Sequence, residues 1–251
     1  MSDNQELVNV QGGALTQPNA PLGFESEEPD DLIIPRVKVI NALSPERKEK
    51  VAEEGDIINS LTRDKLNGKV FVPVFKFNNN IKWRERTEGG GIECIARDGK
   101  MGECSDGSTR MCAACKKNEF DNTKQGKDSV PTCTKYINFF GFIAGERIPL
   151  ILSFAKTNYN EGKKMYSLAK VSMQDMFNFG YLLQSALKAK NGNEWYNIAV
   201  AAAGASSDTD RELAKELYKT FRGSVASMRY DMEEASTDVE GVAPSTDGAE
   251  F

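Results

Sequence analysis

The 251-residue chain contains no histidine. This absence excludes every mechanism that needs an imidazole base, including the Ser-His-Asp triad and a histidine-ligated catalytic zinc. The chain also lacks any apolar run near the roughly 18 residues that span a bilayer, so we expect no membrane association. Residues 1–6 have neither the basic nor the apolar region of a secretory signal, and we therefore expect a cytoplasmic protein.

Motifs for several enzyme classes are missing as well. The sequence has no GxxxxGK[ST] phosphate loop and no GxGxxG turn after a strand, which argues against an ATP-driven motor or a dinucleotide enzyme. A metal-dependent nuclease would need acids such as Glu93, Asp98 or Asp106 to bind magnesium, but no recognisable scaffold brings two of them together. We expect a protein that is not an enzyme, and the nuclease stays an alternative.

The net charge of −5 conceals a strong asymmetry along the chain. Residues 1–30 carry six acids and residues 231–251 carry seven, and neither segment has a lysine or arginine. The central 31–230 therefore hold all 32 basic residues against 24 acids, a charge of +8. A basic body between two acidic ends favours a polyanionic partner such as nucleic acid.

The pattern of apolar residues predicts one mainly β domain over 31–230, between a disordered acidic arm at 1–30 and a disordered acidic tail at 231–251. Two helices are predicted, one from about 172 to 190 after a Ser172–Asp175 capping pair and one at about 208–230. Short strands at turn-like intervals suggest a small barrel or sandwich. The predicted strands cover 32–40, 68–77, 136–143, 147–154, 165–171 and 195–203.

Five cysteines fall within 40 residues, at Cys94, Cys104, Cys112, Cys115 and Cys133. The Cys112–Cys115 pair forms a CxxC knuckle and Cys133 can return to it, which predicts one structural Zn²⁺ held by four thiolates. We prefer Cys94 as the fourth ligand because it ends a strand-like segment, with Cys104 in a glycine-rich loop as its substitute. Disulfides, a redox CxxC and incidental cysteines are the competing interpretations.

Basic and aromatic residues alternate in several segments. Lysine and arginine can follow phosphates while aromatic faces stack on unpaired bases, so this pattern is typical of a single-stranded nucleic-acid site. We expect Phe71, Phe139, Phe142 and Phe154 to be core instead, and 158–164 to be a hairpin tip. The candidate contacts are Lys76, Lys82, Trp83, Arg84, Arg86, Lys135, Tyr136, Lys156, Tyr159, Lys163, Lys164 and Tyr166.

The acidic tail ends in Asp247-Gly248-Ala249-Glu250-Phe251. A basic body followed by such a tail resembles bacterial and phage single-stranded DNA-binding proteins. The motifs Cys94-Ile-Ala-Arg-Asp98-Gly99, Cys112-Ala-Ala-Cys115 and Cys133 are similar to those of a zinc-containing group of these proteins encoded by tailed phages.

The resemblance implies an oligonucleotide-binding (OB) barrel with a zinc loop inserted at about 92–135. It also implies a protein that coats single-stranded DNA in phage replication, recombination and repair, in the host cytoplasm, with self-association on DNA. Glu250 and Phe251 would bind replication or recombination proteins. A zinc-ribbon adaptor of a replication or transcription complex, which binds no DNA, is the other alternative.

Overall fold

The computed structural model describes residues 33–84, 90–119, 131–190 and 192–223, so both acidic ends lie outside the described residues. This part of the chain is mainly β, as expected, with three α-helices where the sequence predicts two: α1 (Pro45–Lys48), α2 (Tyr159–Val171) and α3 (Asp208–Phe221). None of these helices has the length and apolar character needed to cross a membrane. The strands are β1 Val37–Val39, β2 Ile57–Asn59, β3 Val70–Trp83, β4 Ile92–Ala96, β5 Met101–Cys104, β6 Thr109–Met111, β7 Cys133–Ile143, β8 Pro149–Ala155, β9 Phe179–Lys190 and β10 Asn193–Ala205.

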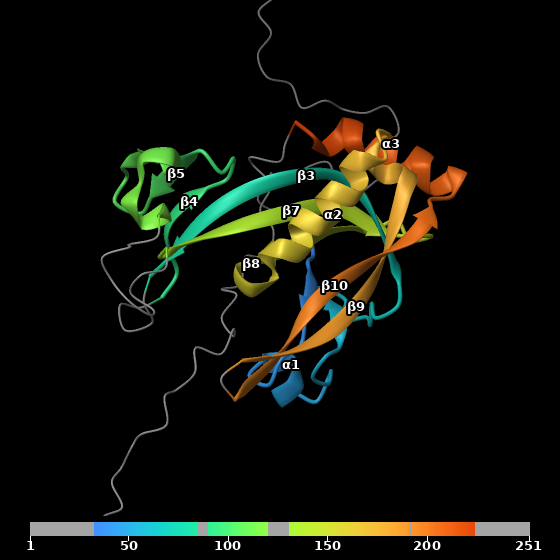
Figure 1. The fold of residues 1–251 in the computed structure, drawn as a ribbon, viewed down its shortest axis with the longest axis horizontal. Coiled ribbons are helices and arrows are strands. Elements are labelled where there is room, and N and C mark those ends of the chain that lie inside the picture. Colours follow the sequence, from blue (N-terminus) through green and yellow to red (C-terminus); the bar gives the residue numbers. More distant parts are fainter. Residues whose placement is uncertain (1–32, 85–89, 120–130, 191, 224–251) are drawn as a thin grey trace, which may run out of the picture.

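Antiparallel pairing joins eight strands into one sheet (Figure 1). Its order is β10-β9-β3-β4-β5-β6, and β3 also pairs with β7, which pairs in turn with β8. β1 and β2 form a separate pair, linked to β8 by a parallel bridge between Arg36 and Ile151. The strand pairing among the described residues does not close, so the sheet is open where the resemblance implies a barrel.

Strands β3 and β7 connect the two parts of the molecule. They pair continuously from Phe71 opposite Ile143 to Lys82 opposite Cys133, apart from a bulge after Pro73. Figure 1 shows both strands running from the body, where α2 lies, to a small lobe formed by β4 and β5. The β3–β7 ribbon is therefore the support on which the lobe is built.

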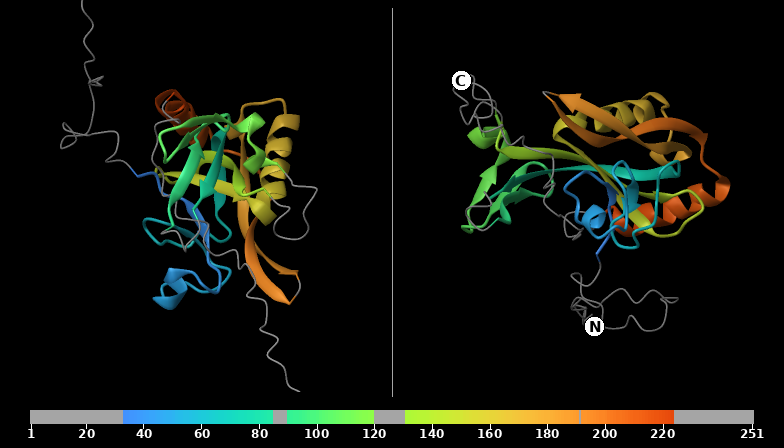
Figure 2. Two further views of the ribbon diagram at one scale, coloured as in Figure 1. Left: turned by 90° about the vertical axis from the view of Figure 1, so that its left-hand side faces the viewer. Right: turned by 90° about the horizontal axis from the view of Figure 1, so that it is seen from below.

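Helices cover the two faces of this ribbon (Figure 2). On one face α2 contributes Met165 and Ala169 to a core that includes Phe139. On the other, α3 contributes Ala214 to a second core, and Phe221 packs against it. The four phenylalanines predicted to be core are confirmed, because each has 0% of its surface exposed: Phe71, Phe139, Phe142 and Phe154.

The prediction for residues 158–171 was wrong. A hairpin tip and a strand were expected, but 159–171 form α2. The buried residues Gly162, Met165 and Ala169 recur at helical spacing, and a Cβ at Gly162 would lie 2.8 Å from the Cβ of Phe154. Glycine thus lets the helix approach β8 closely, and its presence among polar residues suggested a turn.

The prediction for residues 172–190 was also wrong. Ser172 caps the end of α2, and 179–190 form β9 instead of a helix. Tyr181 and Leu183 are buried at the period of two that a strand requires, whereas Leu187, the end of the expected helical stripe, is 52% exposed. Lys190 pairs with Asn193, so β9 and β10 form a hairpin, which an Asn-Gly dipeptide in the sequence commonly signals.

The second predicted helix is confirmed over its first part. α3 begins at Asp208 after the N-cap Ser207, whose side chain accepts a hydrogen bond from the backbone N–H of Asp210. The Asp210 side chain in turn accepts one from the backbone N–H of Gly145, at 3.0 Å. The described helix ends at Phe221, and the remainder of the expected 208–230 lies outside the described residues.

The close approach of β3 to β7 predicts the effect of enlarging Gly141. A Cβ there would lie 2.3 Å from the carbonyl oxygen of Val72 and 2.5 Å from the ring of Phe71. Because a backbone oxygen cannot move aside, we expect Gly141→Ala to lower the free energy of unfolding by about 3 kcal/mol in urea titrations. Gly223→Ala, which meets nothing within 4 Å, is the control. Equal stability of the two variants would contradict this packing.

Candidate metal centre and nucleic-acid interface

Three of the five cysteines lie in one row across the sheet. Lys82 of β3 pairs with Cys133 of β7 on one side and with Cys94 of β4 on the other, and Cys94 pairs with Cys104 of β5. Directly opposed residues of neighbouring strands project from the same face. The pairing therefore brings the thiols of three strands to one side of the lobe.

The CxxC pair completes this cluster. Cys112 begins a short 3-10 turn, η2 (Cys112–Ala114), directly after β6, and the backbone N–H of Cys115 donates to its carbonyl at 3.3 Å. All five thiols are free and line one cavity of about 30 Å³. The structure thus brings together every cysteine that the sequence predicts as a ligand, and Cys104 with them.

Gly102 of β5 makes room for one of these thiols. It is buried, and a Cβ at this position would lie 2.7 Å from the Sγ of Cys94. Any other residue would displace that sulfur, because such a contact is far shorter than van der Waals distance. Glycine here leaves the space that the Cys94 thiol occupies.

Burial and crowding keep two of the thiols protonated in the absence of a cation. Burial, followed by the neighbouring Cys104, Cys133 and Cys112, raises the pKa of Cys94 to about 12. Burial, followed by Cys112 and Cys115, raises the pKa of Cys133 to about 11. A bound cation would reverse this effect, because it stabilises the thiolates and releases their protons.

The charged groups around the cavity have an excess of positive charge. Lys82, Lys117 and Arg110 line it together with a single acid, Glu93. The register between β3 and β4 shifts at Glu93, and its carboxylate pairs with both Lys82 and Lys117. These two ammonium groups hold the pKa of Glu93 below its ordinary value. The net charge of +2 would balance the −2 of a zinc ion bound by four thiolates.

The thiol positions give a test of whether a metal fits. The Sγ of Cys104 donates to the Sγ of Cys94 at 2.9 Å, whereas two thiolates on one tetrahedral zinc lie about 3.8 Å apart, given Zn–S bonds of about 2.3 Å. Within the described ranges, no three His, Cys, Asp or Glu side chains stand in positions that could hold a metal ion. The donor set suits zinc, and the thiols must shift and deprotonate to coordinate it.

A second group of predicted residues lies on α2. Tyr159, Lys163, Tyr166 and Lys170 recur at i, i+4, i+7 and i+11, so they share one face of the helix; we call them the α2 stripe. Lys163, Tyr166 and Lys170 are exposed, and the ammonium of Lys163 lies 5.0 Å from the ring centroid of Tyr159. Aromatic and basic side chains thus alternate along this face, which is exposed from Lys163 to Lys170, while Tyr159 is half-buried against the core.

The α2 stripe meets a polar row on β3. Lys76, Asn78, Asn80 and Lys82 are alternate residues of one strand, so they project from the same face; we call them the β3 row. Lys76 places its ammonium 5.0 Å from the ring centroid of Tyr166 and donates to the side chain of Asn78 at 2.8 Å. Burial lowers the pKa of Lys76. Because Asn80 and Lys82 line the thiol cavity, the row connects the α2 stripe to the lobe.

Three further lysines predicted to contact nucleic acid differ in their surroundings. Lys135 is exposed opposite Asn80, and Lys156 is exposed in the turn before α2. Lys164 donates to the carbonyl of Val200 at 3.2 Å, which fixes α2 to β10.

Aromatic candidates near the lobe are partly or wholly covered. Tyr136 is only 5% exposed and packs with Ile81 and Ile95, and Trp83 packs against the same cluster. Arg84 follows Trp83 and is half-buried. Arg86, Glu250 and Phe251 lie outside the described residues.

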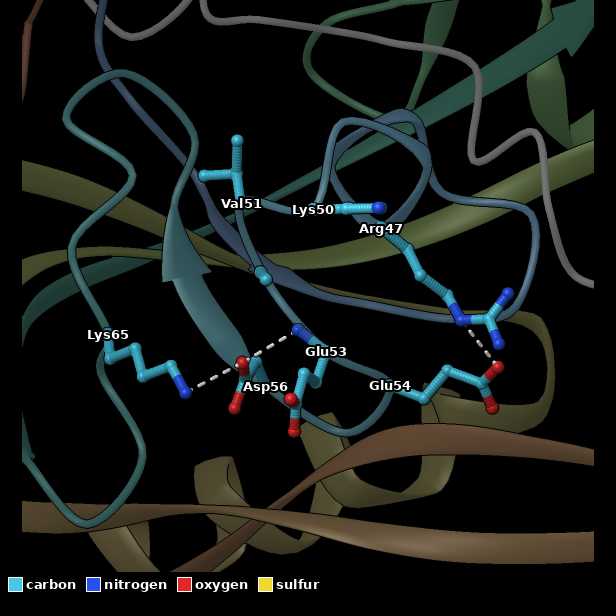
Figure 3. Close-up of a pocket in the computed structure, with 8 residues that line it drawn as sticks. Arg47, Lys50, Val51, Glu53, Glu54, Asp56 and Lys65 are labelled. Atoms are coloured by element: carbon cyan, nitrogen blue, oxygen red, sulfur yellow. Dashed lines mark hydrogen bonds and ion pairs between the residues drawn. The ribbon is translucent and has the colours of Figure 1, made fainter.

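A larger cavity of about 780 Å³ lies beside α1 and has a different character (Figure 3). Its charged residues, three basic and three acidic, balance one another. Arg47 pairs with Glu54 at 2.8 Å and Lys65 with Asp56 at 2.9 Å. Without an excess of positive charge, this cavity does not suit a polyanion.

The carboxylates considered for magnesium are engaged locally. Asp98 accepts hydrogen bonds from the backbone N–H groups of Lys100 and Met101, at 2.7 and 2.9 Å. Asp106 accepts from Ser108, and Glu93 pairs with two lysines as described above. Each therefore shapes the lobe that carries the thiols.

Sequence reasoning missed three basic residues of these surfaces. Lys170 belongs to the α2 stripe, but its spacing to Tyr166 has meaning only once the segment is known to be helical. Arg110 and Lys117 line the thiol cavity, and their positions within two residues of Cys112 and Cys115 were the available signal.

The fold and these surfaces define a mainly β protein with a five-cysteine lobe at one end of its central strands and an aromatic and basic surface beside α2. The family model described as Pam3 phage gp34-like protein matches residues 9–227. The chain therefore belongs to the Pam3 phage gp34-like protein family, which supports a phage origin. No curated protein and no solved structure matches it.

The raised thiol pKa values predict slow alkylation of Cys94 and Cys133. In protein stripped of metal by a chelator, a pKa of about 12 or 11 leaves roughly 0.01% or 0.1% thiolate at pH 8, against about a quarter for an ordinary cysteine. We expect iodoacetamide to label both far more slowly than it labels a cysteine peptide, as followed by mass spectrometry. Labelling at the rate of the peptide would contradict the burial described here.

Proposed function

We propose that this protein binds and coats single-stranded DNA during phage DNA replication, recombination or repair, and that it is not an enzyme. The observation that carries the proposal is the α2 stripe, where tyrosines and lysines alternate along one helix face and Tyr166 meets Lys76 of the β3 row. Single-stranded DNA presents the two features that such a surface recognises, a chain of phosphates and unstacked bases.

The lysines and the tyrosines of this surface would bind different parts of the DNA. Lys163 and Lys170 of the stripe, with Lys135 and Lys156 nearby, would neutralise phosphates and release counterions. Tyr159 and Tyr166 would stack on bases, at about 1 to 3 kcal/mol for each base. A duplex keeps its bases stacked inside, so it would use the lysines and leave the tyrosines without a partner. The surface therefore favours a single strand over a duplex.

Zinc enters the proposal as a structural ion. Cys94, Cys112, Cys115 and Cys133 would hold it. After burial, Cys133 and Cys112 are among the neighbours that raise the pKa of Cys94, and Cys112 and Cys115 raise that of Cys133, so the four thiols lie close together. Cys104, which donates to the sulfur of Cys94, would support this ligand without binding the metal. These cysteines would then join β4, β7 and the CxxC turn through one structural ion, in a lobe whose own apolar cluster is small.

The remaining parts of the proposal concern the wider molecule. In the proposed OB-like domain, the β1–β2 pair would be joined to the main sheet through its parallel bridge to β8. Glu250 and Phe251 would bind replication or recombination proteins, since an aromatic residue beside a carboxylate fits an apolar pocket with a basic rim. Self-association along DNA completes the proposal.

Tyr166→Ala tests the DNA proposal. Loss of one stacked base should weaken binding of a labelled oligo-dT by about 5- to 150-fold, measured by fluorescence anisotropy. Tyr218→Ala is a matched control, because Tyr218 is also an exposed helical tyrosine, 43% against 38% for Tyr166, but lies on α3 across the sheet. Equal affinity of the two variants would contradict the assignment of the α2 stripe.

Metal analysis tests the zinc proposal. We expect one zinc per chain in the purified protein, its loss in Cys115→Ser, and its retention in Cys104→Ser, because Cys104 serves as a hydrogen-bond donor that serine can replace. Atomic emission of the purified proteins gives the stoichiometry directly. A zinc-free wild type would refute the proposal, and loss of zinc in Cys104→Ser would assign the fourth ligand position to Cys104.

A further inference from the structure

The long hairpin formed by β9 and β10 carries a basic surface that sequence reasoning did not assign. We propose that its outer face, formed by Lys188, Lys190 and Trp195, is a second contact for single-stranded nucleic acid that continues the path from the α2 stripe. This inference rests on the proposed function. It adds that the hairpin, which we call the arm, contributes to the length of strand that one protein molecule covers.

The strand register separates the two faces of the arm. Lys188 pairs with Trp195, and Lys190 pairs with Asn193, so these four side chains project from one face. Tyr196 belongs to the opposite face, which continues into the core through Ile198 and Val200. The outer face has two lysines and an indole and carries no acid, since Glu194 lies on the other face.

The edge of β10 and the inner face fix the arm to the body. The side chain of Asn41 accepts from the backbone N–H of Tyr196 at 2.6 Å and donates to its carbonyl at 3.3 Å, as a neighbouring strand would. The ring of Tyr196 covers Gly55, where a Cβ would lie 2.9 Å from it. Figure 2 shows the hairpin extending from the body beyond α2. The outer face is therefore held in place before any ligand arrives.

The outer face is continuous with the surface beside α2. Asn197, two residues from Trp195 on the same face, is 6% exposed and donates to the hydroxyl of Thr157 at 3.4 Å. Thr157 belongs to the turn η5 (Lys156–Asn158) that leads directly into α2. A strand that leaves Tyr159 and Lys156 thus meets Trp195 next and the two lysines after it.

The three side chains have unused capacity to bind a ligand. Lys188 and Lys190 are exposed, and no ion pair joins either of them to another described residue. The indole N–H of Trp195 is buried and has no acceptor among the described residues. Lysines pair readily with phosphates, and the half-buried Trp195 would use the accessible part of its ring to stack on bases, so single-stranded nucleic acid suits this face.

Oligonucleotides of two lengths test this inference. A dT strand of about 8 nucleotides fits within one binding surface, whereas one of about 30 can also reach the arm. We expect Lys188→Ala/Lys190→Ala to bind the short strand as the wild type does. For the long strand, it should flatten the slope of log affinity against log salt by about 1.4. Trp195→Ala should weaken binding of the long strand by about 5-fold or more.

Lys215→Ala/Lys219→Ala is the matched control, because it removes the same charge from exposed positions on α3. Wild-type slope and affinity of the arm variants on the long strand would overturn the inference while the α2 stripe still binds. Loss of short-strand binding in the lysine variant would also overturn it, by showing that the arm is not a separate contact. If the wild type binds neither strand, the proposed function fails first.

Discussion

The pairing of β3 with β7 is the constraint on which the other features depend. In this register Lys82 lies between Cys133 and Cys94, and Lys76 lies beneath Tyr166. A slip of one residue would turn the β3 row to the opposite face and separate the thiols. A buried hydrogen bond at 2.8 Å from Asn138 to Asn79 helps to prevent this, because a slip would break this bond inside the core.

The sequence predicted the strands of this frame well and its helical segments poorly. Runs such as 68–77 and 136–143 have apolar residues on both faces, which a buried strand requires and few other structures tolerate. Residues 165–171 were predicted as a strand and 179–190 as part of a helix, the reverse of the structure, because their apolar spacing fits both periods over short lengths. Tertiary contacts decide between helix and strand. Gly162 lets α2 pack closely against Phe154, and β9 pairs with β10.

The parts of the candidate site that depend on spacing along the chain were predicted from the sequence, and the parts that depend on the fold were not. Cysteine spacing identified the thiol cluster, since a CxxC pair and a returning cysteine need no knowledge of the fold. The aromatic and basic residues were predicted as residue types, but which of them are exposed was not. Tyr136 is buried against Ile81 and Ile95, whereas Tyr166 lies on the exposed face of α2, and only the fold decides this. The opposite faces of the arm likewise become distinct only in the paired hairpin.

The central claim is that a mixed aromatic and basic face, supported by a cysteine-rich lobe, recognises single strands. Titration of the wild type with oligo-dT and with a duplex of equal length, each at 50 and 200 mM salt, tests this claim most directly. The claim predicts tighter binding of the single strand and a slope of log affinity against log salt of about −3 or steeper. Equal affinity for the two DNAs, or binding that does not change with salt, would contradict it.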